Sequence, residues 1–277
     1  MSDQTANYVM GHTDHERRRL ALQAAVLNPL TDAFLRRAGI SAGMNVLELG
    51  CGIGEVSLIA ARLVGPHGRL HCLDFDPTAL ETARGRVRSA GHDHVVFEQI
   101  DIHDHAPERP YDAVIGRLIL VHTPDPLAVL RKAVSVLQPG GVAAFQEGDF
   151  TCCPRGYPEM PLTWKALDWI VACIGRIVAQ PNMGAQLFNL MQEAGLQPPE
   201  CRAECAMDGG PHSPFYEWFA ETVRSLLPHM ERLGLTTAAE VDINTLADRL
   251  RAEALEKRGA AMSPMMIGAF ARKPHGD

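Results

Sequence analysis

Residues 46–54 read VLELGCGIG, and this stretch decides the fold. Its first half is apolar, as expected of a strand that is buried on both faces of a parallel sheet. Its second half carries glycine at alternate positions, Gly50, Gly52 and Gly54. Glycine permits a tight turn and a close approach of a ligand to the backbone, and a helix that starts there offers free N–H groups. The stretch therefore predicts a strand, a ligand-binding turn and a helix.

Strand and helix patterns alternate on the C-terminal side of this turn. The expected strands cover 45–49, 69–73, 94–100, 111–115 and 142–146, and the expected helices cover 55–63, 77–90 and 126–137. Strands that alternate with helices at this spacing form right-handed βαβ units, and such units build a mostly parallel sheet. The predicted fold class is therefore α/β, with its core within residues 41–150.

The flanking segments are predicted to be mainly helical. Residues 15–38 indicate one amphipathic helix or two helices broken at Asn28-Pro29. Beyond Phe150, helices are expected at 162–178, 184–194 and 213–258, with strands at 201–207 and 265–272. We interpret residues 1–40 as an N-terminal helical lid, 41–150 as the core, and 151–277 as helical cap segments plus the last strands.

Large apolar side chains are frequent in the C-terminal half. They are Trp164, Trp169, Met183, Phe188, Tyr216, Trp218 and Phe219. Taken singly, such residues at helical spacing are more typical of a core than of a cofactor site. As a set they predict an apolar cap over a pocket, which would suit a small, partly hydrophobic acceptor and exclude water.

Acidic residues and a glycine pair mark the ends of further strands. Asp74 ends the second strand, roughly 20 residues beyond the turn, where an acid can bind ribose hydroxyls. Asp101 closes the third strand, and the sequence PGG at 139–141 precedes the fifth. Ligands of open α/β sheets bind beyond the carboxyl ends of the strands. These residues therefore predict a cofactor site at that edge of the sheet.

The composition argues against several classes of partner. The net charge is −7, which offers no basic surface for nucleic acid. No run approaches the roughly 18 apolar residues of a membrane span, and the polar N-terminus lacks the apolar stretch of a signal peptide. A cytoplasmic protein with a small-molecule substrate is expected, without nucleic-acid or membrane partners, and a homodimer is left open.

The segments ELGCGIG, CLDFDP, FEQIDI, YDAVIGRLILVH and LQPGG follow one another within residues 40–150. In this order they resemble the consecutive motifs of class I S-adenosylmethionine-dependent methyltransferases, of the small-molecule UbiE and secondary-metabolite type. The glycines follow GxGxG with Glu48 before the first, unlike the dinucleotide fingerprint GxGxxG, which favours S-adenosylmethionine over NAD. The resemblance implies a Rossmann-like sheet with an antiparallel last strand, a helical cap, and S-adenosylmethionine as cofactor.

The same resemblance implies cofactor contacts around the glycine turn. Gly50, Gly52 and Gly54, with Cys51 between them, would line the methionine and ribose portions of the cofactor. Glu48 would help to position the methionine end.

The adenosine part of the cofactor would lie against the next two strand ends. By resemblance, Asp74 would take the ribose diol and Phe75 would flank the adenine. Asp101 would accept from the adenine amino group, while the backbone of Ile102 donates to the ring.

Three more residues are implied beside the methionine part or over the cofactor. Arg117 and Leu118 would lie beside the methionine part, although Arg117 could also form an ordinary surface ion pair. Tyr8, in the segment YVMG at 8–11, would close over the cofactor, as in some small-molecule methyltransferases, or would simply pack.

Candidate bases lie near strand ends. Methyl transfer is an in-line displacement from an activated sulfonium, so positioning supplies much of the rate. A base is required only if the acceptor must lose a proton. His122, after the fourth strand, and Glu147 and Asp149, after the fifth, are the candidates. The alternatives are a capping or packing role for His122 and a solvated loop for the two acids.

Four histidines bracket the third strand: His92, His94, His103 and His105. Histidine is a common metal ligand. No carboxylate or cysteine pattern around these four fits zinc geometry, however, so they are interpreted as solvated and no metal is expected.

The resulting prediction is an S-adenosylmethionine-dependent methyltransferase that acts on a small, partly hydrophobic molecule, by O-methylation in secondary metabolism. The alternatives are a C-methyltransferase of a quinone-like or prenyl acceptor, and an S-adenosylmethionine-binding cyclase that does not transfer methyl. Methylation of a peptide or protein is a further hypothesis, against which the aromatic helical segments argue.

Overall fold

The computed structural model describes residues 14–151 and 153–275 and divides the chain into two compact units. The sheet unit comprises Asn28–Asp149, Asn182–Glu204 and Met265–Asp277. The helical unit comprises Met1–Leu27, Phe150–Pro181 and Cys205–Pro264. The units therefore alternate along the chain, whereas the sequence-based domains were contiguous segments divided at residues 40 and 150.

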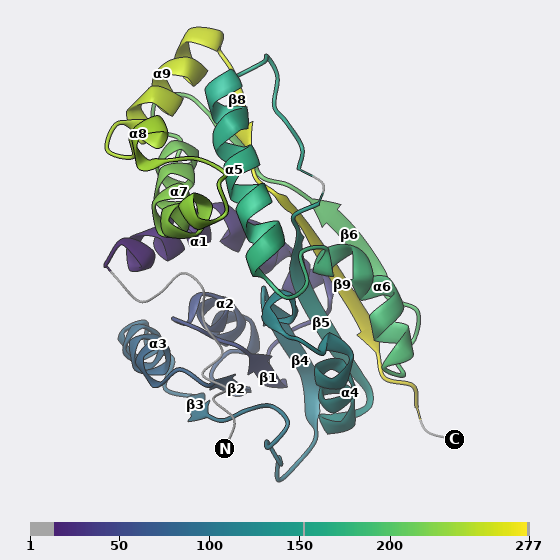
Figure 1. Ribbon diagram of the computed structural model, residues 1–277. Helices are drawn as coiled ribbons and strands as arrows, with labels where there is room; N and C mark the ends of the chain where they lie inside the picture. The colour runs from purple at the N-terminus through teal and green to yellow at the C-terminus, as the bar shows by residue number, and fades with distance from the viewer. Residues whose placement is uncertain (1–13, 152, 276–277) are drawn as a thin grey trace. The chain divides into compact units, whose positions relative to one another are not determined.

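A seven-stranded sheet forms the centre of the sheet unit (Figure 1). Its strands are β1 (Asn45–Leu49), β2 (Arg69–Asp74), β3 (Val95–Gln99), β4 (Tyr111–Arg117), β5 (Leu137–Asp149), β6 (Glu200–Glu204) and β9 (Met265–Arg272). The strand order is β3-β2-β1-β4-β5-β9-β6, and β9 runs antiparallel to both of its neighbours. The other pairs are parallel. The predicted Rossmann-like sheet with an antiparallel last strand is confirmed.

Apolar side chains keep the central strands buried on both faces. Val46, Leu47, Ala113, Val114 and Ile115 are all 0% exposed. Alternate residues of a strand point to opposite faces of the sheet, so full burial of successive residues requires a helical layer on each side. The apolar first half of the quoted stretch is thus explained by the position of β1 in the middle of the sheet.

Helices α2 (Glu55–Val64) and α4 (Pro126–Val136) cover opposite faces of the sheet. The crossover from β1 to β2 and that from β4 to β5 run in opposite directions across the sheet, and both are right-handed. Helix α3 (Pro77–Ser89) contacts α2, and α6 (Met183–Glu193) contacts α4. The apolar layer on the α2 face also includes Phe34 and Leu35 of α1 (Asp14–Arg37).

Local capping explains where two of these helices begin. Asp76 accepts a hydrogen bond from the N–H of Thr78 at 2.8 Å, and Pro77 follows as the first residue of α3. Asp125 accepts from the N–H of Ala128 at 2.9 Å at the start of α4. Both arrangements satisfy N–H groups that the first helical turn leaves free. Helix α1, in contrast, is continuous through Pro29, so the single-helix alternative is confirmed.

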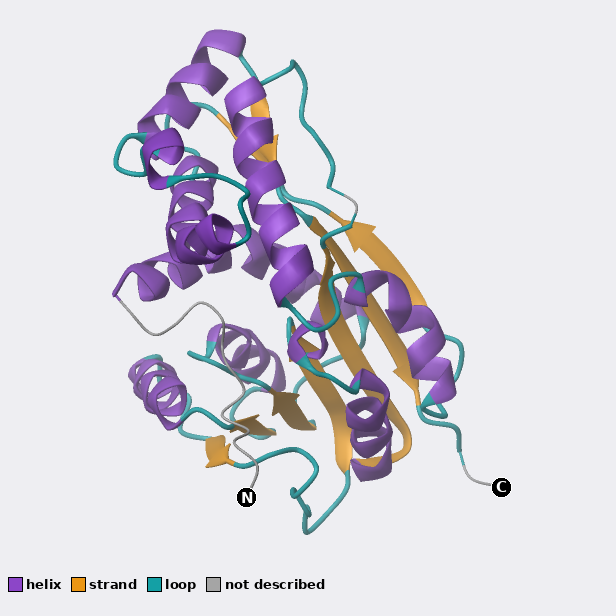
Figure 2. Cartoon of the chain, viewed as in Figure 1, coloured by secondary structure: helices purple, strands orange, loops and turns teal. Residues whose placement is uncertain are grey.

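The helical unit is built from α5, α7, α8 and α9 with the first part of α1 and a two-stranded sheet (Figure 2). These elements are α5 (Pro161–Ile177), α7 (Phe215–Arg232), α8 (Ala238–Val241), α9 (Leu246–Lys257), β7 (Met207–Gly209) and β8 (Ala260–Met262). Rings of Phe215, Trp218 and Phe219 contact one another with centroids 5.6–5.8 Å apart. Met183 and Phe188 belong instead to α6 of the sheet unit, so their assignment to the predicted cap is wrong.

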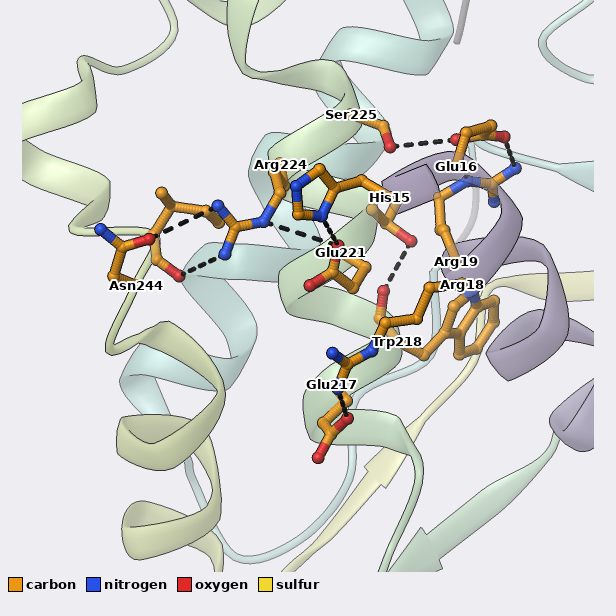
Figure 3. Close-up of polar contacts among 12 residues, drawn as sticks. His15, Glu16, Arg18, Arg19, Glu217, Trp218, Glu221, Arg224, Ser225 and Asn244 are labelled. Atoms are coloured by element: carbon orange, nitrogen blue, oxygen red, sulfur yellow. Dashed lines mark hydrogen bonds and ion pairs between the residues drawn. The ribbon is translucent and has the colours of Figure 1, made fainter. Parts of the chain in front are cut away.

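A buried ion pair links the first part of α1 to α7 within the helical unit (Figure 3). Two nitrogens of Arg19 donate to the two oxygens of Glu16 at 2.9 and 2.5 Å. Ser225 of α7 donates to the same carboxylate at 3.0 Å. Glu16 and Arg19 are 1% and 3% exposed, so the geometry offsets a large desolvation cost.

Among the helices within residues 14–151 and 153–275, none is long and apolar enough to cross a bilayer.

Candidate functional site

The glycine turn between β1 and α2 has the backbone conformation that glycine favours. Gly50, Gly52 and Gly54 have φ values of +63°, +51° and +84°. A Cβ on Gly50 would lie 2.5 Å from Cδ1 of Ile119, so packing as well as the dihedral requires glycine there. A Cβ on Gly52 would meet no atom of residues 14–151 and 153–275 within 4 Å. The Gly52 side of the turn is therefore open, as a cofactor-binding backbone must be.

Asp74 connects this turn to the end of β2. Its Oδ2 accepts from the N–H of Gly52 at 2.8 Å, and its Oδ1 accepts from the N–H of Asp76 at 3.0 Å. Burial raises the pKa of Asp74 above its ordinary value. The two parallel strands thus bring a carboxylate and a glycine backbone together at one edge of the sheet, where a ribose diol was predicted to bind.

Glu48 lies in β1, two residues before Gly50, and is buried inside the sheet unit. Its side chain is 2% exposed, and its Oε2 accepts from Ser57 Oγ at 2.6 Å and from Cys72 Sγ at 3.2 Å. Burial raises its pKa to about 7, against the opposing effect of these hydrogen bonds. Through Ser57 and Cys72, Glu48 connects β1 to α2 and to β2, and in this way it supports the strand that leads into the turn. Its contact with the methionine end stays a prediction.

The predicted adenine residues lie at the ends of β2 and β3. Phe75 directly follows Asp74 and is 52% exposed. Asp101 is exposed and accepts from the N–H of His103 at 2.8 Å. The N–H of Ile100 donates to the carbonyl of Asp74 at 3.2 Å. That bond holds the segment leading to Asp101 and Ile102 beside the end of β2.

Arg117 ends β4 and is held by uncharged partners from α1. Its Nη1 donates to Asn28 Oδ1 at 2.9 Å and to Thr31 Oγ1 at 2.8 Å. Burial lowers its pKa to about 10. The surface ion pair considered from the sequence is therefore wrong. Leu118, the next residue, has φ +53°, and its N–H donates to the carbonyl of Gln146 at 3.0 Å.

Glu147 anchors the backbone that follows β4. Its Oε1 accepts from the N–H groups of Ile119 and Leu120 at 3.0 and 2.9 Å, and its Oε2 accepts from that of Val121 at 3.2 Å. The side chain is 0% exposed, so the solvated-loop alternative is wrong. Burial raises its pKa to about 7 against three backbone hydrogen bonds. This environment favours an anchoring role over the predicted role as a base.

His122 is the last residue of the short 3₁₀ helix that Glu147 anchors, Leu120–His122, and it is exposed. Its role as a base stays a prediction. Tyr8 lies outside the described residues, and so does its predicted closure over the cofactor.

No sequence motif indicates the residues that brace this region. Asn28 and Thr31 hold Arg117 from α1, while Arg86 of α3 donates to the carbonyl of Ile53 in the turn at 2.7 Å. Arg86 also pairs with Glu55 at 2.6 Å. Each contact joins residues more than 25 positions apart, and local patterns carry no signal for such pairs. The local signal is the presence of two polar residues, Asn28 and Thr31, in the mostly apolar stretch of α1.

The geometry described so far is that of a mostly parallel α/β sheet with a glycine turn and a buried carboxylate at the carboxyl ends of its strands, where ligands of such sheets bind. A family model described as a methyltransferase domain matches residues 40–194, which is more than half of the chain. The chain belongs to this methyltransferase family, and its cofactor is S-adenosylmethionine.

Individual relatives agree with this assignment. A demethylmenaquinone methyltransferase of Listeria monocytogenes is 29% identical over 181 residues, covering 56% of this chain and 71% of that protein. The methyltransferase GfsG of Streptomyces halstedii is 33% identical over 120 residues, covering 43% and 42% of the two chains. The crystal structure of the [4+2]-cyclase SpnF aligns with a TM-score of 0.53 and 18% identity over 90% of this chain and 82% of that one. The last likeness shows the fold alone.

Gly52→Ala is expected to weaken binding of S-adenosylhomocysteine at least tenfold, because its Cβ would enter the open side of the turn. Gly43→Ala is the matched control. Gly43 has φ +87°, and within the part of the chain that the structure describes no atom lies within 4 Å of an added Cβ, but Gly43 precedes β1, at the end of that strand opposite the glycine turn. Both variants should lose about 1–2 kcal/mol of stability, the cost of a left-handed L-residue. Equal affinities in calorimetric titrations of the two variants would contradict the assignment of the turn.

Asp74→Ala is expected to weaken cofactor binding by about 1–3 kcal/mol, the cost of leaving buried hydroxyls unpaired. Asp76→Ala serves as control, since it removes a carboxylate two residues away that caps α3. Calorimetry should show a clear loss for the first variant and near wild-type affinity for the second. Unchanged affinity of Asp74→Ala would rule out its ribose contact.

The stability of the protein is expected to fall as the pH rises from about 4.5 to 7, in part because of Glu48. Its pKa is about 7 in the folded protein and 4.5 in the unfolded chain, so the folded state binds more protons within this window. One such group changes the free energy of unfolding by at most about 1.4 kcal/mol per pH unit. Urea unfolding should show a shallower fall for Glu48→Gln than for wild type. Glu81→Gln, on the exposed side of α3, should match wild type; identical slopes for all three proteins would contradict the prediction.

Proposed function

We propose that this chain transfers the methyl group of S-adenosylmethionine to an oxygen atom of a small, partly hydrophobic molecule in secondary metabolism, as a cytoplasmic enzyme. The observation that carries the cofactor half of the proposal is the Gly52–Asp74 hydrogen bond at the carboxyl edge of the sheet. It joins an open glycine backbone to a carboxylate suited to a ribose diol. Family membership supports the transfer of methyl.

In this proposal the sheet unit binds and orients the cofactor. Gly50, Gly52 and Gly54, with Cys51, would face the methionine and ribose portions, and Asp74 would take the ribose hydroxyls. Phe75, Asp101 and Ile102 would surround the adenine, while Glu48, Arg117 and Leu118 would support the methionine end. When bound, S-adenosylmethionine supplies a methyl group that is already activated on a sulfonium, so alignment of the acceptor accounts for much of the catalysis.

The proposed chemistry needs little acid or base assistance from the described residues. Both oxygens of Glu147 are engaged by backbone N–H groups, so we assign it to anchoring the segment after β4. His122, which is exposed at the end of that segment, is then the candidate to take a proton from an acceptor hydroxyl. An acceptor that is already ionised would need no base.

A carbon acceptor is the second candidate, and the relatives favour it. The Listeria protein that shares 29% identity with this chain is a demethylmenaquinone methyltransferase, covered over 71% of its length. By analogy with its name, a quinone-like acceptor would be methylated here. An oxygen acceptor rests instead on the range of small-molecule methyltransferases that the sequence motifs resemble.

Incubation with methyl-labelled S-adenosylmethionine tests these alternatives. We expect label in a hydroxylated aromatic or aliphatic acceptor, with the new group identified as a methoxy group by NMR, and loss of turnover in Asp74→Ala. Label on a ring carbon of a reduced quinone would establish the second candidate. A product that forms without label, undiminished by a non-transferring cofactor analogue, would establish a cyclase and overturn the proposal.

A further inference from the structure

Three potential metal ligands meet on one side of the sheet unit, from two strands and a loop. His71 lies in β2, Glu98 in β3, and His105 in the segment between β3 and β4. Oε2 of Glu98 is 3.0 Å from Nε2 of His71 and 3.4 Å from Nδ1 of His105. The three ligand atoms all lie within 4.8 Å of one another.

These separations suit a tetrahedral ion. Zinc binds imidazole nitrogen and carboxylate oxygen at about 2.0–2.2 Å, which places neighbouring ligands of a tetrahedron roughly 3.3 Å apart. The two distances to Glu98 are 3.0 and 3.4 Å before any adjustment. Two imidazoles with one carboxylate also form a donor set that selects zinc-like transition ions over magnesium or calcium, which prefer oxygen.

Tyr111 fixes both histidines from the other side. Its hydroxyl is 2.8 Å from Nδ1 of His71 and 2.9 Å from Nε2 of His105. These are the two ring nitrogens that do not face Glu98. A phenol oxygen has lone pairs to accept both N–H groups, which leaves the lone pairs of the two opposite nitrogens directed at the space beside Glu98. Histidines that bind metals are commonly held by such a partner on the second nitrogen.

The side chain of Glu98 faces a buried ring nitrogen of the cluster. Nε2 of His71 is buried and lies 3.0 Å from Oε2 of Glu98. A divalent ion between these two atoms would be coordinated by both. Glu98 is 41% exposed, so an ion could enter from solvent along its side chain.

We propose that His71, Glu98 and His105 form a binding site for a zinc-like divalent transition ion, with Tyr111 orienting both imidazoles. Water would occupy the fourth position. The ion would connect β2, β3 and the segment that carries His105, and that same segment contains Asp101 and Ile102. The sequence predicted that the protein binds no metal, and this proposal departs from that prediction. It does not depend on which molecule accepts the methyl group.

Calorimetric titration of the tag-free, EDTA-treated protein with Zn²⁺ tests the site. We expect one strong site per chain and a raised midpoint of thermal unfolding in the presence of the ion, with no such response to Mg²⁺. Titration with Co²⁺ should give the visible absorption of a tetrahedral ion without the intense near-ultraviolet band of a thiolate ligand. A thiolate band would place the metal on cysteines and overturn the proposal.

Two variants identify the ligands. Glu98→Gln keeps the shape of an exposed side chain and should weaken Zn²⁺ binding at least tenfold. Tyr111→Phe keeps all three ligands and should weaken binding by about 10–100-fold, the usual effect of losing a partner that orients a ligand. Circular dichroism establishes that each variant is folded.

The double variant His92→Ala/His94→Ala is the matched control. It removes two histidines that are not among the proposed ligands and whose ring centroids lie 5.6 Å apart. This variant should therefore bind Zn²⁺ like wild type. Absence of stoichiometric binding in wild type would leave the cluster as a hydrogen-bonded network only and overturn the proposal. Wild-type affinity in folded Glu98→Gln, or a loss confined to the control, would do the same.

Discussion

The hydrogen bond from the Gly52 N–H to the Asp74 carboxylate is the contact on which the cofactor edge of the sheet depends. It forms only because Gly52 adopts a left-handed φ of +51°, which turns its N–H toward the neighbouring strand end. The bond connects the ends of β1 and β2, and among the described residues no atom lies within 4 Å of a Cβ placed on Gly52. A binding surface made of backbone is thus created by a single conformational constraint.

Two buried carboxylates support this edge without lying on its surface. Glu147 receives three backbone N–H groups from the segment after β4, and Glu48 receives the hydroxyl of Ser57 and the thiol of Cys72. In each case burial raises the pKa to about 7, and hydrogen bonds oppose the shift. A raised pKa at a strand end therefore does not by itself identify a base, because a carboxylate that organises backbone has the same signature.

The family match and the helical unit occupy different parts of the chain. The methyltransferase family model ends at residue 194, so α7, α8 and α9 lie beyond the residues that define the family. Helix α7 holds the Phe215, Trp218 and Phe219 cluster, and its Ser225 donates to the buried Glu16–Arg19 pair of α1. The glycine turn and Asp74, in contrast, lie within the residues that the family model matches.

The sequence by itself determined the class of sheet and the glycine turn, because these follow from local order: an apolar strand, glycines at fixed spacing, and an acid at the next strand end. The cofactor followed from the resemblance of the ordered motifs to those of class I methyltransferases. Tertiary structure alone decided which polar residues act together. His71 lies inside β2, and no local pattern connects it with Glu98. The parallel pairing of β2 with β3 places His71 beside Glu98, and the segment between β3 and β4 brings His105 to the same carboxylate. Likewise, Glu147 is a candidate base from the sequence because it follows the predicted fifth strand, and only the tertiary structure shows its burial and its three hydrogen bonds from the backbone after β4. Such contacts depend on strand register and on side-chain burial, which no local pattern encodes.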